Sequence, residues 1–183
     1  MPDALHFTGN DEADRLLAAD PLALLIGFAL DQQVPVQTAF QGPWKLQERL
    51  GTLDPGKVAA TDPAELEAAF RQKPAIHRFP AKMAQRVQAL AAHVRDEYGG
   101  EAECVWSDAP DAETLRSNIA ALPGFGQMKV KALGSVLAKR FGVTAAQGLI
   151  PAHPTLGDVD SAQALEEYQA KKRAYKAGLR AGR

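Results

Sequence analysis

Cysteine and long apolar runs are scarce in this sequence. Its 183 residues include one cysteine, Cys104. A single thiol excludes a disulfide framework and an iron–sulfur cluster, which takes about four thiolates, and it is typical of a reducing compartment. The most apolar run, Leu22 to Leu30, is far shorter than the roughly 20 residues that cross a bilayer. No export or anchoring signal is visible, so we expect a cytoplasmic protein without a membrane partner.

Metal-binding patterns are also missing. The four histidines, His6, His77, His93 and His153, are scattered, and no HxxxH or CxxC spacing brings potential ligands together. We therefore expect neither a metal site nor another cofactor.

Charged side chains are unevenly distributed. The formal net charge is −1, but residues 1–67 carry 4 basic and 11 acidic side chains. Three later stretches, residues 71–95, 116–157 and 171–183, contain basic residues and no carboxylate. Such blocks can bind a polyanion even when the whole chain is nearly neutral, and solvated helix faces are the equally weighted alternative.

Apolar residues recur at helical spacing and almost never alternate, which predicts an all-α fold forming one compact unit. We expect a core lobe over residues 20–142 and a second small lobe made of residues 1–19 and 143–183. Proline and glycine separate the predicted helices. These cover residues 11–19, 22–34, 37–50 with a break near Gly42-Pro43, 63–71, 80–98, 111–122, 127–141 and 161–180, with residues 143–160 as a loop.

A very short connection joins two of these helices within residues 111–141. Gly124 and Gly126 flank one apolar residue and allow a tight turn that leaves backbone amides exposed at the start of the second helix. Together with the helix dipole, such amides form a site for an anion such as a phosphate. Phe125 is expected to anchor the turn in the core. An ordinary helical hairpin is the alternative.

Two lysines follow this turn. Lys129 is one helical turn in, where its ammonium is expected to reach the same phosphate. Lys131 lies about 200° away around the helix, so we expect it at a second contact or in solvent. Arg86, from the first basic block, is a further expected DNA contact.

The LPGFG sequence of residues 122–126, followed by a lysine-bearing helix, resembles the helix-hairpin-helix motif of the base-excision DNA glycosylase superfamily. That superfamily includes endonuclease III and the 3-methyladenine glycosylases. The segment 29–34, Ala-Leu-Asp-Gln-Gln-Val, is similar to the Gln-Gln helix of the alkyladenine branch, where a glutamine probes or fills the gap in the duplex. Gln32 and Gln33 are about 100° apart on a helix, so only one is expected to enter the DNA groove.

The resemblance extends over about residues 20–143. Residues 74–94 resemble the pre-hairpin segment of the family, and in particular that of a small bacterial subgroup without the iron–sulfur cluster. The resemblance to this superfamily implies a two-lobed helical fold and a duplex DNA partner with a damaged base.

Departures from the family pattern affect the expected chemistry. The family's catalytic aspartate lies shortly beyond the hairpin, but residues 143–151 contain no carboxylate. Asp158 and Asp160 come later and reach the site only if the loop folds back. The lyase-type lysine of bifunctional members falls on Met128, so Schiff-base chemistry is not expected.

Asp31 is the substitute candidate. It follows an apolar helix, whose surroundings are expected to raise its pKa. A carboxylate near the sugar stabilises the positive charge that develops as an N-glycosidic bond breaks. The alternative is that Asp31 only marks the solvent side or last turn of its helix.

Aromatic side chains are candidates for stacking on an extruded base. Trp44, at an expected helix start, and His77 are the first choices, and Trp106 and Phe28 are others. A position in the core is the alternative for each.

The resemblance implies a monofunctional DNA glycosylase that hydrolyses the N-glycosidic bond of a damaged base. An alkylated purine is the expected substrate, because its cationic base is already a good leaving group and less of the barrier must be lowered by the protein. A non-catalytic DNA-binding or lesion-recognition protein is the alternative, and a helical protein-interaction domain is the third. We expect a monomer.

Overall fold

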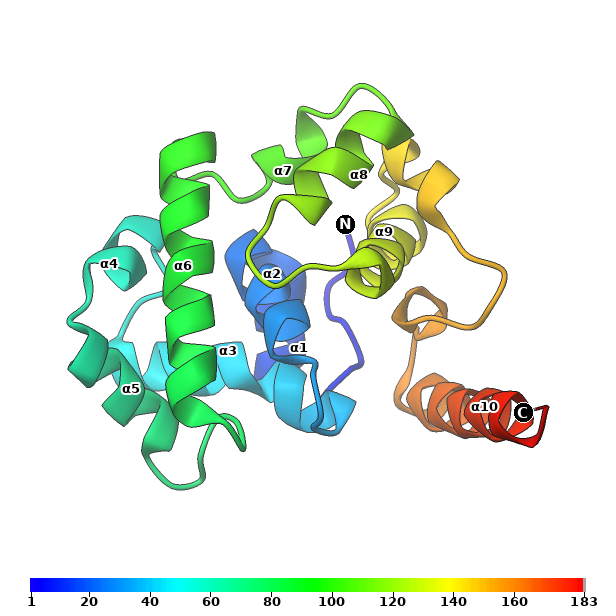
Figure 1. Ribbon diagram of the computed structural model, residues 1–183, viewed down its shortest axis with the longest axis horizontal. Helices are drawn as coiled ribbons and strands as arrows, with labels where there is room; N and C mark the ends of the chain where they lie inside the picture. Colours follow the sequence, from blue (N-terminus) through cyan, green and yellow to red (C-terminus); the bar gives the residue numbers. More distant parts are fainter. Residues whose placement is uncertain (183) are drawn as a thin grey trace.

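The computed structural model describes residues 1–182, and within that range every regular element is helical (Figure 1). The elements are α1 (Asp11–Ala19), α2 (Pro21–Leu30), α3 (Val36–Leu50), α4 (Pro55–Ala60), α5 (Pro63–Arg71), α6 (Pro80–Tyr98), α7 (Cys104–Ser107), α8 (Ala112–Ala120), α9 (Gln127–Arg140), the 3-10 helices η1 (Thr144–Leu149) and η2 (Leu156–Asp158), and α10 (Ala162–Ala181). The all-α prediction is confirmed.

Two predicted helices differ from the observed ones. Helix α2 ends at Leu30, so residues 31–34 lie in a loop and not on the helix as expected. Helix α3 continues through Pro43, and the predicted break there is wrong. The reason lies in packing, since a Cβ at Gly42 would collide with the side chain of Leu30. Close contact between α2 and α3 therefore outweighs the poor helix propensity of these residues.

Helix α2 forms the centre of the molecule (Figure 1). The Asp20 carboxylate caps its N-terminus by accepting hydrogen bonds from the amides of residues 22 and 23. Every residue from 22 to 30 is buried. Gly27 leaves space for Phe40 of α3, whose ring meets that of Phe28 edge-on at a centroid distance of 5.0 Å. Burial on all sides explains why this segment has no polar face.

The other helices pack on either side of this centre. Helices α4 and α5 pack against the long helix α6, while α8, η1 and η2 lie with α9 (Figure 1). Helix α1 packs on α2 and α3, and α10 packs on η2. The predicted apolar stripe of α6, from Met83 to Val94, is buried.

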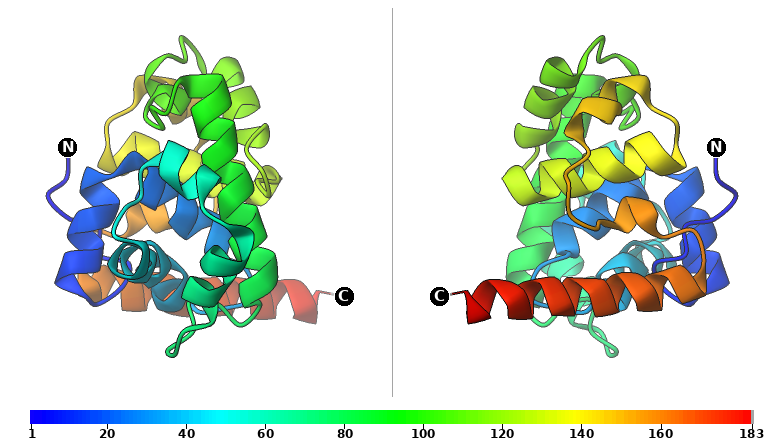
Figure 2. Two further views of the ribbon diagram at one scale, coloured as in Figure 1. Left: turned by 90° about the vertical axis from the view of Figure 1, so that its left-hand side faces the viewer. Right: turned by 90° about the vertical axis from the view of Figure 1, so that its right-hand side faces the viewer.

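Helix α10 lies at one edge, and its C-terminal end projects beyond the rest of the chain (Figure 2). Leu165 and Tyr168 anchor its first half in the core, whereas residues 173–182 are exposed. Within residues 1–182, no helix combines the length and the apolar character needed to cross a membrane.

Candidate functional site

The turn between α8 and α9 is open to solvent at the position expected to bind phosphate. Gly124 adopts a left-handed conformation with φ of 82°, which glycine tolerates without strain. Gly126 precedes α9 as its N-cap, and no side chain caps the amides of that helix end. Gly126 and Met128 are exposed, while Phe125 between the glycines is buried in the core as predicted. The first turn of α9 contains no acidic residue, so its amides and dipole favour an anion.

Arg86 joins this turn to the loop that follows α2. Its guanidinium packs against Gly124, where an added Cβ would lie 2.7 Å from Nε. The same guanidinium donates a hydrogen bond of 2.6 Å to Oε1 of Gln32. Two segments that the sequence singled out separately are therefore in contact through one arginine.

His77 holds the same loop from inside and is not available to stack on a base. Its ring is 1% exposed. Nδ1 accepts a hydrogen bond from the amide of Phe79, so Nε2 carries the proton and donates to the carbonyls of Leu30 and Gln32 at 3.1 and 3.0 Å. Burial lowers the pKa of His77, in keeping with this neutral form.

Gln33 is at the tip of the loop. Its side chain is exposed, and its backbone has a φ of 58°. A left-handed conformation is strained for a residue other than glycine, by about 1 kcal/mol, and such strain is most often found at functional sites. Since the loop is not helical, the orientations of Gln32 and Gln33 differ from the helical expectation: Gln32 bonds Arg86, and Gln33 points to solvent.

A cavity of about 560 Å³ lies beside the turn, between the end of α2, the first half of α9 and α10. Asp31 and Lys129 both line it, and Phe28 forms part of its apolar wall. Lys131, which was expected at a second contact or in solvent, lines the same cavity.

Lys129 lines this cavity and is bonded within the protein. Its Nζ donates a hydrogen bond of 3.2 Å to the carbonyl of Ala29 and lies 5.7 Å from the centre of the Phe125 ring. Burial, with a smaller effect of Arg86, lowers the pKa of Lys129 to about 8, although Asp31 acts in the opposite direction. The structure thus places Lys129 at the wall of the cavity, bonded to the carbonyl of Ala29.

Asp31 is the C-cap residue of helix α2 and lines the cavity with Lys129, Lys172 and Lys176. Burial raises the pKa of the Asp31 carboxyl above its usual value, and nearby positive charges, Lys172 foremost, oppose the rise. A partly buried carboxylate among ammonium groups is the arrangement that acid–base catalysis uses, and structural charge networks also produce it.

Helix α10 supplies the part of the site that sequence reasoning missed. Lys172 and Lys176 line the cavity with Tyr175, whose ring stacks on that of His153 at 5.9 Å and 28°. The available signal was a lysine in the middle of the otherwise apolar and aromatic stripe of this helix, which indicates a solvated cavity and not a core.

Asp158 and Asp160, the candidate carboxylates that follow the hairpin in the sequence, lie outside this cavity. Asp158 accepts a hydrogen bond from the amide of Thr155, which completes a capping box for η2, and it pairs with Lys139 at 2.5 Å. These partners lower the pKa of Asp158 against the effect of its burial. Asp160 is exposed. Neither residue lines the cavity that contains Asp31.

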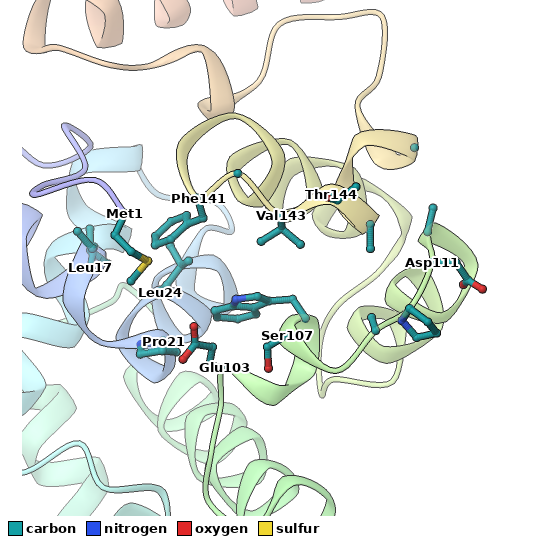
Figure 3. Close-up of a pocket in the computed structure, with 18 residues that line it drawn as sticks. Met1, Leu17, Pro21, Leu24, Glu103, Ser107, Asp111, Phe141, Val143 and Thr144 are labelled. Carbon is teal, nitrogen blue, oxygen red and sulfur yellow. The ribbon is translucent and has the colours of Figure 1, made fainter.

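The two tryptophans also lie away from Asp31. Trp44 is inside α3, not at a helix start, and lines a shallow hollow with Arg49 and Pro74. Trp106 is buried in the wall of a separate cavity of about 590 Å³ at the C-terminal end of α9, formed with Leu24 and Phe141 (Figure 3). The proposed roles of both residues in stacking on a base are therefore not supported by their positions.

Within the described residues, no group of three or more His, Cys, Asp or Glu side chains is arranged to hold a metal ion. Comparisons with protein-family models, with curated proteins and with solved structures gave no match to this chain. The geometry described above is therefore the basis for a functional proposal.

Proposed function

We propose that this chain binds duplex DNA, extrudes a damaged base and hydrolyses its N-glycosidic bond. The observation that carries the proposal is that Asp31 and the first turn of α9 line one cavity beside an open helix N-terminus. A strand held by its phosphate at that helix end has its sugar next to the cavity, so an extruded base has a place to enter.

Binding in this proposal rests on three features. The uncapped amides at Gln127 and Met128 receive a backbone phosphate, and Gly126 lets that phosphate approach closely. The exposed and strained Gln33 is the side chain that probes the gap left by the base. Arg86 keeps the loop and the turn at a fixed separation through Gln32 and Gly124.

Asp31 and water perform the chemistry. The bond between C1′ and the base nitrogen breaks with its electron pair going to the base, and the Asp31 carboxylate stabilises the positive charge that develops on the sugar. Water then adds its oxygen to C1′ and gives a proton to the carboxylate. A raised pKa brings the Asp31 carboxyl closer to the range in which it works as a base near neutral pH.

The main alternative to direct hydrolysis is a lyase mechanism in which Lys129 forms an imine with the sugar. A lysine with a pKa of about 8 is roughly one-tenth uncharged at pH 7, which is enough for attack on an aldehyde. Reduction with borohydride traps an imine as a covalent protein–DNA adduct. If the enzyme hydrolyses the bond directly, we expect no adduct and no strand cleavage. An adduct that is trapped in the wild type but not in Lys129→Met would show a lyase mechanism in place of direct hydrolysis.

The test is an assay for abasic product with duplexes that each carry one damaged base. Activity is expected in the wild type and not in Gly126→Val, whose side chain blocks the phosphate. No atom lies within 4 Å of a Cβ at this position, so the variant is expected to fold. Salt-sensitive DNA binding without product from any lesion would instead establish the non-catalytic alternative, which the open helix end and basic residues support equally well.

A further inference from the structure

The cavity beside the hairpin has a strong excess of positive charge. Its wall contains the four lysines Lys129, Lys131, Lys172 and Lys176 and the single carboxyl of Asp31. These lysines come from two helices, α9 and α10, that are far apart in the sequence, so the fold concentrates a charge that neither segment has alone.

Such a wall acts against a positively charged ligand. Ions separated by about 8 Å at an effective dielectric constant of about 20 interact by roughly 2 kcal/mol, and the excess of ammonium groups over carboxylates makes the net effect on a cation repulsive. An N7-methylated guanine or N3-methylated adenine in DNA carries a formal positive charge. The charge of the cavity therefore disfavours the bases that sequence reasoning expected as substrates.

The same wall favours a neutral base as it leaves. When its bond to C1′ breaks, a neutral base takes the electron pair and becomes an anion, with the charge spread over its ring nitrogens and carbonyl oxygens. Ammonium groups placed around that base stabilise the anion more than the neutral starting state, which lowers the barrier. Proton transfer from Lys129 or water then completes the departure, and water supplies the hydroxyl group at C1′.

The cavity also offers a flat surface to such a base. The rings of His153 and Tyr175 are stacked, and Tyr175 is 49% exposed. Planar bases bind well to aromatic side chains of this kind. Lys172 and Lys176 precede and follow Tyr175 on the same helix, so hydrogen-bond donors border the surface on which the base would stack.

We propose that this cavity selects neutral, carbonyl-bearing bases, the products of deamination or oxidation, over cationic alkylated bases. The inference rests on the function proposed above and specifies its substrate class. It assigns selectivity to Lys172 and Lys176 of α10, while Asp31 retains the role in bond cleavage.

Binding to non-cleavable duplexes tests the inference separately from catalysis. Each duplex contains one 2′-fluoro-2′-deoxynucleotide, with uracil, hypoxanthine or 7-methylguanine as the base, because the fluorine suppresses formation of the sugar cation. The Kd of the wild type is expected to be about tenfold lower for the two neutral bases than for 7-methylguanine.

Two double variants that each remove two positive charges test whether the preference for neutral bases depends on the cavity lysines. Lys172→Gln with Lys176→Gln is expected to abolish the preference. Arg173→Gln with Arg180→Gln alters exposed residues of the same helix that do not line the cavity, and it is expected to weaken binding to all three duplexes equally. Equal or tighter binding of 7-methylguanine, or equal effects of the two double variants on the preference, would overturn the inference. Failure of every duplex to bind would instead reject the proposed function together with this inference.

Discussion

Arg86 donates a 2.6 Å hydrogen bond to the side-chain carbonyl of Gln32 while its guanidinium packs on Gly124. The two partners lie 92 positions apart in the sequence, on the loop after α2 and on the turn before α9. Because one side chain contacts both, the loop after α2 and the turn before α9 are fixed relative to each other. Arg86 thus joins two segments of the candidate site that are distant in the sequence.

Substitution of Gly124 by alanine is expected to disturb this contact. The new methyl group is placed in a left-handed conformation and within 3 Å of Arg86, which must move and lose Gln32. We expect a loss of about 2 kcal/mol in the free energy of unfolding, measured with urea. Gly142→Ala is the matched control, since Gly142 also has a positive φ but no atom within 4 Å of its Cβ. It is expected to lose only about 1 kcal/mol, and equal losses in both variants would show that the contact with Arg86 contributes nothing.

The stability of the fold is expected to depend on His77 at mildly acidic pH. Burial, the largest effect, lowers the pKa of the folded-state imidazole below its ordinary value of 6.5, so the unfolded chain takes up a proton first as the pH falls. The contribution of neutral His77 is therefore complete above pH 6.5 and is lost progressively below it. Urea unfolding between about pH 7.5 and pH 5 should show a smaller pH dependence in His77→Gln than in the wild type. Identical slopes would contradict a buried neutral imidazole.

The projecting half of α10 is expected to contribute phosphate contacts. Arg173 and Arg180 are exposed on this helix, where the second half contains no acidic residue. Removing both charges as Arg173→Gln with Arg180→Gln should reduce the slope of log K against log salt by about 1.8, if each neutralises one phosphate. An unchanged slope would place the DNA away from α10.

Lys129 is expected to limit the reaction at alkaline pH. In the proposed reaction the ammonium form of Lys129 stabilises the departing base, and this form is lost as the pH rises through its pKa of about 8. The single-turnover rate of excision should therefore decrease above that pH. Lys129→Arg keeps the positive charge and should remove the decrease, whereas Lys131→Arg should retain it. A pH profile that is the same in all three proteins would exclude this role.

Two of the predicted helices have an end that a local sequence signal marks clearly. Asp62 before Pro63 and Gly99 after Tyr98 are local signals, and each marks an observed helix boundary. Phe125 and the glycines around it also have the expected burial and exposure. Local chemistry decides these features, so they can be recognised without knowledge of the fold.

The rest of the site depends on contacts between distant segments. The continuation of α3 through Pro43 follows from its packing on α2. The structural role of His77 follows from its hydrogen bonds to the carbonyls of Leu30 and Gln32 in the loop after α2. Helical spacing gives the direction of Lys129 around the helix axis but not what lies there, so its hydrogen bond to Ala29 was not predictable. Lys172 and Lys176 were missed for the same reason, since no local pattern shows that α10 returns to Asp31.

The rate at which Asp31→Asn excises a damaged base tests the central claim most directly. Asn has the shape of Asp but cannot carry its charge, so single-turnover excision should decrease by roughly 100-fold or more while DNA binding persists. Asp158→Asn is the matched control; it weakens the cap of η2 and the pair with Lys139, and should reduce stability by about 1 kcal/mol without changing the rate. Full activity in Asp31→Asn, or a greater loss in Asp158→Asn, would contradict the assignment of Asp31 as the catalytic carboxylate.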